Sequence, residues 1–144
     1  MRIRHGVALL LTLLAGGAAA QGVPDLRGTW NPRDSAHIVE GDSRHAPSGS
    51  TVVPGQDIYR RNTSPFVFRI EGQDGRTFWG TLSSAQVRER LIGALSVDGR
   101  RFVMADDDGH FDGVVVDGDT LDYCYYHIQP GHSAVACGLL VRQR

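Results

Sequence analysis

Four of the five Asp-Gly dipeptides in the second half of this chain separate runs in which apolar and polar residues alternate. They lie at residues 74–75, 98–99, 108–109 and 117–118. Asp-Gly between alternating runs favours a β-hairpin turn, because both residues tolerate a positive φ. The pattern therefore predicts an antiparallel up-and-down meander. One stretch departs from it: Ser83 and Gln86 have capping-box spacing, which predicts a short helix or helical turn over 83–90.

Two-residue turns also predict which side chains share a face of the sheet. Turns at the first three dipeptides and at Pro130-Gly131 place the apolar residues of neighbouring strands on one common face. The face expected to point inward comprises Phe66, Phe68, Ile70, Trp79, Leu91, Leu95, Phe102, Met104, Phe111, Val115, Tyr126, Ile128, Val135, Leu139 and Val141. On the opposite face, Tyr123, Tyr125 and Leu140 are expected to form an apolar patch outside the sheet.

The segment before the meander predicts a first strand over 25–31, ended by Pro32, and a weak strand at 36–40. Residues 41–57 are rich in Gly, Ser, Pro and charge, and we expect a long mobile loop there. The sequence thus predicts an all-β fold, an antiparallel up-and-down meander of about eight strands. Closure into a barrel removes the two edges that such a sheet exposes. The interior of an eight-stranded barrel is filled by side chains or holds one small ligand.

The N-terminus has the parts of a secretory signal peptide. Arg2 and Arg4 precede a short apolar run that ends in three alanines. We expect cleavage near Ala20, which leaves one domain of residues 21–144 in the periplasm or outside the cell. No other segment is long and apolar enough for a membrane span. Without the signal peptide, acids outnumber arginines, which argues against a nucleic acid partner.

The two cysteines fit an exported protein. The turn at 130–131 places Cys124 directly opposite Cys137, at a pair without backbone hydrogen bonds, where the Cα atoms approach to about 4.5 Å. That separation is within reach of a disulfide, and an oxidising compartment allows it to form. We therefore predict a Cys124–Cys137 disulfide that links the last two strands.

Gly28-Thr29-Trp30 on the first strand, together with Arg142 on the last, resembles the lipocalin and avidin group of small secreted barrels. In that group a Gly-x-Trp tryptophan closes one end of the barrel and an arginine of the final strand packs over it. The resemblance implies structural roles for Gly28, Trp30 and Arg142, with a cation–π contact between the last two. Alternation places Arg142 on the face opposite Val141, so a bulge or the barrel end must bring it to Trp30.

Candidate chemistry is sparse. The chain has no lysine and no Gly-x-Ser-x-Gly turn, and we expect neither an enzyme nor a cofactor. The acids of 106–108 resemble a calcium loop, but a solvated hairpin turn is the preferred interpretation. Cys124, His127, His132 and Cys137 have a spacing similar to zinc ligands, but strand alternation separates them, so the disulfide is preferred and no metal is expected.

We expect an exported β-barrel that binds a small apolar or amphipathic ligand or a protein partner. The candidate ligand-binding residues are Phe68, Trp79, Phe102 and Tyr126. The alternative is a filled barrel that binds proteins, such as an envelope module or a protease-inhibitor-like protein. The expected outer patch suggests a homo-oligomer or another protein partner, unless segment 32–64 covers it. Cavity volume distinguishes the small-ligand barrel from the filled one.

Overall fold

The computed structural model describes residues 22–41, 51–52 and 58–144, which form ten strands and no helix. In chain order these are β1 (Gly28–Gly41), β2 (Thr51–Val52), β3 (Ile58–Arg61), β4 (Val67–Asp74), β5 (Thr77–Ser83), β6 (Arg88–Leu95), β7 (Arg101–Ala105), β8 (His110–Asp117), β9 (Thr120–Gln129) and β10 (His132–Arg142). Within these ranges, no helix has the length and apolar character of a membrane span. The expected signal peptide and most of the expected 41–57 loop lie outside the described residues.

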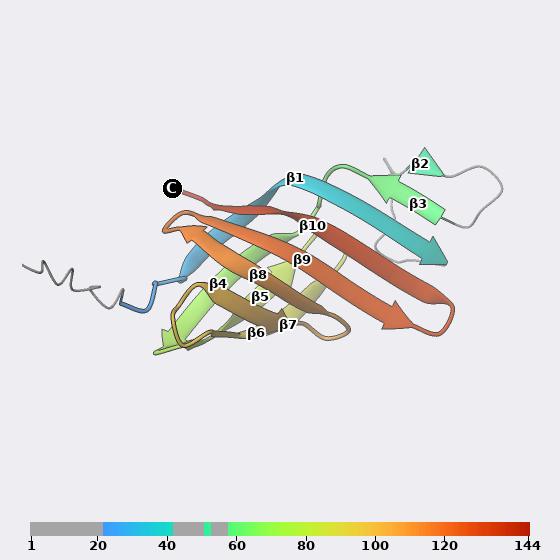
Figure 1. Ribbon diagram of the computed structural model, residues 1–144. Helices are drawn as coiled ribbons and strands as arrows, with labels where there is room; N and C mark the ends of the chain where they lie inside the picture. The colour runs from blue at the N-terminus through green and yellow to red at the C-terminus, as the bar shows by residue number, and fades with distance from the viewer. Residues whose placement is uncertain (1–21, 42–50, 53–57) are drawn as a thin grey trace, which may run out of the picture.

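Eight of the strands close into an antiparallel barrel (Figure 1). Consecutive strands pair from β4 to β10, and β1 pairs with both β10 and β4, which closes the ring. β1 is long enough to pair with two different strands along one of its sides. Residues 28–30 pair with β4, and residues 37–40 pair with β3, which carries β2 on its outer edge. The all-β, antiparallel, closed meander expected from the turns is confirmed.

β1 continues through Pro32, and the prediction that the first strand ends there is wrong. The strand pairs with β10 from Trp30 to Gly41, with a register shift between Arg33 and Ala36. Residues 31–36 lie between the part of β1 that pairs with β4 and the part that pairs with β3. Among the described strands, none pairs with residues 31–36 on that side, so this stretch of β1 is an edge. Edge positions accommodate proline, because no partner strand needs its missing N–H.

The hairpin registers follow the predicted turns in two cases. Leu95 pairs with Phe102, and Cys124 pairs with Cys137, as expected. The β7–β8 connection is the loop 106–109 rather than a two-residue turn, so Phe102 pairs with Gly113 instead of Val115. A shift of two residues keeps every side chain on its face.

Two β-bulges invert the expected faces of β5, β9 and β10. The register between β4 and β5 shifts at Glu71, and the register between β8 and β9 shifts at Val116. A shift of one residue turns every following side chain to the other face. The corrected inward set includes Phe78, Leu82, Tyr123 and Leu140, whereas Trp79, Ile128 and Val135 are exposed. The expected outer patch of Tyr123, Tyr125 and Leu140 therefore lies inside the barrel, and this basis for a homo-oligomer is removed.

The predicted helical turn over 83–90 is also wrong. The Ser84 hydroxyl accepts hydrogen bonds from the backbone amides of Gln86 and Val87, each at 3.2 Å. The Ser84 amide donates to the Val87 carbonyl at 2.8 Å. These bonds close a tight turn between β5 and β6, because a serine side chain competes with helical hydrogen bonds for nearby amides.

Aromatic side chains fill the barrel. Trp30, Phe68, Phe78 and Phe102 are at most 2% exposed. The Phe68 ring packs edge-on against Phe111, with 5.4 Å between ring centroids. Edge-to-face pairs of this kind stabilise a core beyond the area they bury.

Candidate functional site

Trp30 closes one end of the barrel. Its side chain is 0% exposed, and its indole Nε1 donates to the Leu26 carbonyl at 2.9 Å. Leu26 is held in turn by Gln73, whose side-chain oxygen accepts from the Leu26 amide at 2.8 Å. The segment before β1 therefore folds across this end and satisfies the polar atom of the buried tryptophan.

Arg142 packs over Trp30 as the resemblance implies, with its guanidinium carbon 4.2 Å from the ring centroid. The guanidinium donates to the backbone carbonyls of Asp25, Arg27 and Gly118. No bulge in β10 is needed, because Leu140 rather than Val141 points inward and Arg142 follows it by plain alternation. Arg142 thus joins the chain before β1 to the β8–β9 turn.

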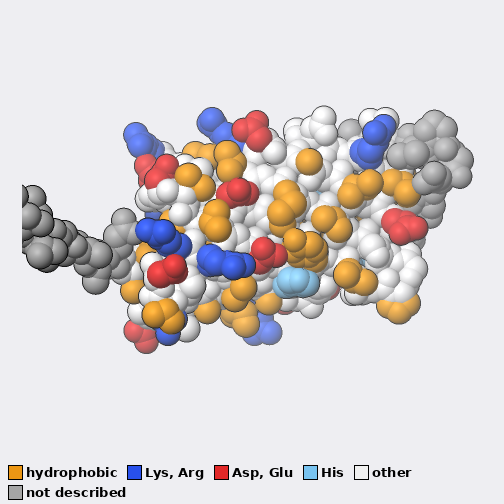
Figure 2. Space-filling view, viewed as in Figure 1, with side chains coloured by type: hydrophobic (Ala, Val, Ile, Leu, Met, Phe, Trp, Pro, Cys, Tyr) orange, Lys and Arg blue, Asp and Glu red, His pale blue; other side chains and the backbone are white. Residues whose placement is uncertain are grey.

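Gly28 belongs to the same arrangement. Its φ is 139°, and a Cβ at this position would lie 3.0 Å from Nη1 of Arg142. A side chain here would meet both an unfavourable backbone conformation and the arginine. Charged side chains gather at this end of the molecule, where the N-terminal segment joins the barrel (Figure 2). Arg144 and Arg142 both pair with Asp119 there.

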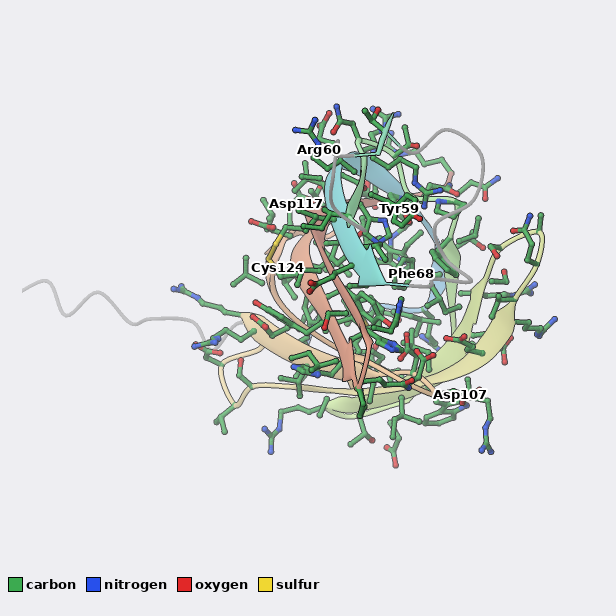
Figure 3. The ribbon with its side chains drawn as sticks, turned by 90° about the vertical axis from the view of Figure 1, so that its right-hand side faces the viewer. Tyr59, Arg60, Phe68, Asp107, Asp117 and Cys124 are labelled. Atoms are coloured by element: carbon green, nitrogen blue, oxygen red, sulfur yellow. A yellow bond between two sulfur atoms is a disulfide. The ribbon has the colours of Figure 1, made fainter. Side chains whose placement is uncertain are left out.

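The predicted disulfide joins Cys124 of β9 to Cys137 of β10, with Cα atoms 4.1 Å apart. It lies on the outer side of the barrel wall, whereas Phe68 points into the ring of strands (Figure 3). The bond therefore links two neighbouring strands without occupying the interior.

The four candidate ligand-binding residues separate into two groups. Phe68 and Phe102 are buried in the barrel, at 1% and 2% exposure. Trp79 is 48% exposed on the outer wall, because the bulge at Glu71 turns β5 over. Tyr126 also faces outward, where its ring stacks on His110 with 5.1 Å between centroids. The four residues do not share one cavity, and their proposed ligand role stays a prediction.

The interior cavity is small. It lies at the end of the barrel opposite Trp30, and its volume is about 30 Å³. That volume suits one or two water molecules. The lining consists of His37, Ser64, Phe66, Phe68, Leu82, Glu89, Asp106, Phe111, Tyr123, Tyr125, Ala134 and Ala136. The barrel is therefore nearly filled, apolar in its middle and polar at this open end.

An acidic cluster forms the polar wall at the open end. Oxygens of Glu89, Asp106 and Asp108 lie within 4.8 Å of one another. Burial raises the pKa of Asp106, and the neighbouring charge of Asp108 raises it further, while backbone amides of the loop act in the opposite direction. Burial also raises the pKa of Tyr125, followed by the charges of Asp106 and Asp108. The Tyr125 hydroxyl donates to Oδ1 of Asp108 at 3.3 Å.

His127 approaches the same cluster from β9. Its Nδ1 lies 3.1 Å from Oδ1 of Asp108, and the two side chains are 3% and 11% exposed. The ring of His132 packs edge-on against His127, with 4.7 Å between centroids. The structure thus brings a buried imidazole to carboxylates from two other segments of the chain.

A second concave surface lies on the outer wall of β5, β6 and β7. Trp79, Ile92 and Val103 are 48%, 64% and 59% exposed and stand on adjacent strands. Thr77, Ala94 and Ala105 also line this shallow groove, whose volume is about 590 Å³. We call it the outer groove. The three exposed apolar side chains thus lie side by side in one groove.

Sequence reasoning missed both Glu89 and the outer groove. Glu89 lies between two arginines and two residues before Leu91, so Glu89 and Leu91 point to the same face of the strand. This places an acid on an apolar face. That signal was sufficient to predict a buried carboxylate. The outer groove depends on the inversion of β5, which the sequence does not reveal.

No family model, curated protein or solved structure matches the chain. The likeness to lipocalin and avidin barrels therefore rests on the closed eight-stranded barrel and on the contact between Trp30 and Arg142.

Proposed function

We propose that this protein is an exported, non-enzymatic barrel of the lipocalin and avidin type that binds a protein partner through the outer groove. The observation that carries the proposal is the row of exposed apolar side chains across three strands, with a tryptophan at one end. Tryptophan in an apolar surface pocket is the residue type most enriched among binding hot spots. The disulfide is typical of exported proteins and supports this location.

The filled interior favours this function over transport of a small ligand. Pockets for small molecules usually have volumes of roughly 300–1,000 Å³. The interior cavity, at about 30 Å³, is too small for such a ligand. The buried pair of His127 and Asp108 lies at the same end of the barrel. The small interior cavity therefore favours protein binding over transport of a small ligand.

The charge around the outer groove indicates the chemistry of the partner. Arg69, Arg90 and Arg101 are exposed on β4, β6 and β7, close to the groove in the strand register. Asp112 pairs with Val103, and Asp74 pairs with Thr77, so the rim carries both signs of charge. We infer a protein partner with an apolar ridge bordered by charges of complementary sign, because complementary potentials guide association.

The experiment is site-specific photo-crosslinking in the cell that makes the protein. A benzophenone amino acid replaces Ile92 in the groove or, as a matched control, Ile128 on β9, which is 76% exposed on the same outer wall. We expect a discrete adduct from position 92 and none from position 128. The crosslinked protein, once identified and purified, should bind Ile92→Glu at least about tenfold more weakly than the wild type.

Other outcomes overturn the proposal. Equal crosslinking from both positions would mean that the groove has no special affinity. An adduct of two copies of this chain would replace the separate protein partner by self-association. Unchanged affinity of the purified partner for Ile92→Glu, with the variant correctly folded, would place its binding site elsewhere.

A further inference from the structure

We propose that Glu89, Asp106 and Asp108 bind a hard divalent cation of the calcium class at the open end of the barrel. The three side chains come from β6 and from the loop 106–109, and each brings an oxygen within 4.8 Å of the other two. The proposal concerns the barrel end and does not depend on the outer groove.

Burial makes the close approach of these carboxylates costly. Glu89 is 5% exposed, and the Asp108 side chain is 11% exposed. Carboxylates removed from water and placed side by side lose hydration and repel one another. A cation between them removes both costs, since it replaces water as a ligand and neutralises the charge.

His127 is a second observation that points to the same place. Its imidazole is 3% exposed and turns Nδ1 toward Asp108, 3.1 Å from Oδ1. Neither ring nitrogen of His127 forms a hydrogen bond within the described part of the chain. A buried imidazole directed at one of three clustered carboxylates fits a positioning role, because groups behind metal-ligating carboxylates fix their orientation.

The loop 106–109 fixes the Asp106 carboxylate through one oxygen and leaves the other oxygen available to a cation. Its Oδ1 accepts hydrogen bonds from the amides of Gly109 at 2.6 Å and Asp108 at 3.3 Å. Its Oδ2 is buried and has no hydrogen-bond partner among the described residues. One oxygen thus anchors the side chain, and the other is left as an acceptor inside the cluster.

The donor set selects the class of cation. The three side chains offer only carboxylate oxygens, which suit calcium, magnesium and manganese. Calcium takes six to eight oxygens in flexible geometry and accepts bidentate carboxylates and water. Zinc favours nitrogen and sulfur, and both cysteines of this chain are in the disulfide. Calcium is therefore the first probe.

The test is isothermal titration of calcium into the mature, disulfide-bonded protein after removal of metals with a chelator. We expect one calcium per chain and a higher melting temperature with calcium than with chelator. Glu89→Gln and Asp106→Asn should each weaken binding at least about tenfold, as ligand loss does in carboxylate sites. The matched control is Asp107→Asn, which removes one charge from the same loop at an exposed position at its edge (Figure 3) and should bind calcium normally.

The chelator measurement shows whether the variants fold. In chelator, both amide variants should melt at or above the wild-type temperature, because they remove repulsion between neighbouring carboxylates. Absence of calcium binding by the wild type, with stabilised amide variants, would mean that a proton holds the cluster together and would overturn the proposal. Calcium binding that is equal in all variants, or a response to zinc alone, would also overturn it.

Discussion

The two tryptophans of the chain offer a direct test of the barrel's closed end. Trp30 is 0% exposed, and Trp79 is 48% exposed. Truncation of a fully buried Trp to Ala costs about 3–5 kcal/mol of unfolding free energy. Trp30 also loses its 2.9 Å hydrogen bond to the Leu26 carbonyl and its 4.2 Å contact with Arg142, so Trp30→Ala belongs in the upper half of that range.

Trp79→Ala is the matched comparison and should cost about 1 kcal/mol, since only half of that side chain leaves water. Urea unfolding followed by far-UV circular dichroism, with the disulfide intact, measures both variants. A urea dependence of about 2 kcal/mol per M converts these costs into midpoint decreases of about 2 M and about 0.5 M. Trp30→Phe should fall between them, because it keeps the ring and loses the hydrogen bond. Equal midpoints for the two alanine variants would refute the assignment of Trp30 as the plug.

Three further predictions concern the disulfide, a glycine and the N-terminal segment. Replacing Cys124 and Cys137 together by Ser should lower the unfolding free energy by roughly 3 kcal/mol, measured as a urea midpoint, and reductant should then have no further effect. Gly28→Ala should lower the melting temperature, whereas Gly118→Ala, with open space around its Cβ, should not; equal effects would contradict the close approach of Arg142. Hydrogen bonds from the side chain and backbone amide of Arg27 lower the pKa of Asp25 from its usual 3.8 to about 2. Its stabilisation is therefore present above about pH 4 and is lost as the pH falls from 4 to 2, so Asp25→Asn should flatten the acid limb of a melting-temperature profile.

The error in the expected faces has one physical origin. Beside the β4–β5 turn, the observed pairing of Asp74 with Thr77 differs by two residues from the register predicted for a turn at 74–75, and a difference of two preserves the faces. The extra residues Glu71 and Val116 changed the parity. A bulge follows from twist and closure of the whole ring, and no local residue pattern marks these two positions.

The candidate site shows the same limit. The acids of 106–108 are evident in the sequence, but they are consecutive and no terminal glutamate follows at EF-hand spacing, which favours a solvated turn. Glu89 and His127 reach this loop only because β6, β8 and β9 meet at the open end. Two strands, β7 and β8, lie between Glu89 on β6 and His127 on β9, so their approach depends on the curvature of the barrel.

By itself, the sequence determined the class of fold, the order of the strands in the meander and the disulfide. These follow from local chemistry: turn residues, alternation and one possible cysteine pair. The contact between Trp30 and Arg142 was implied by the resemblance to lipocalin and avidin barrels. Only the tertiary structure decided which tryptophan is buried, how full the interior is and which charges meet at the open end. Those features depend on the register around a closed ring, where one extra residue in a strand reverses every side chain that follows.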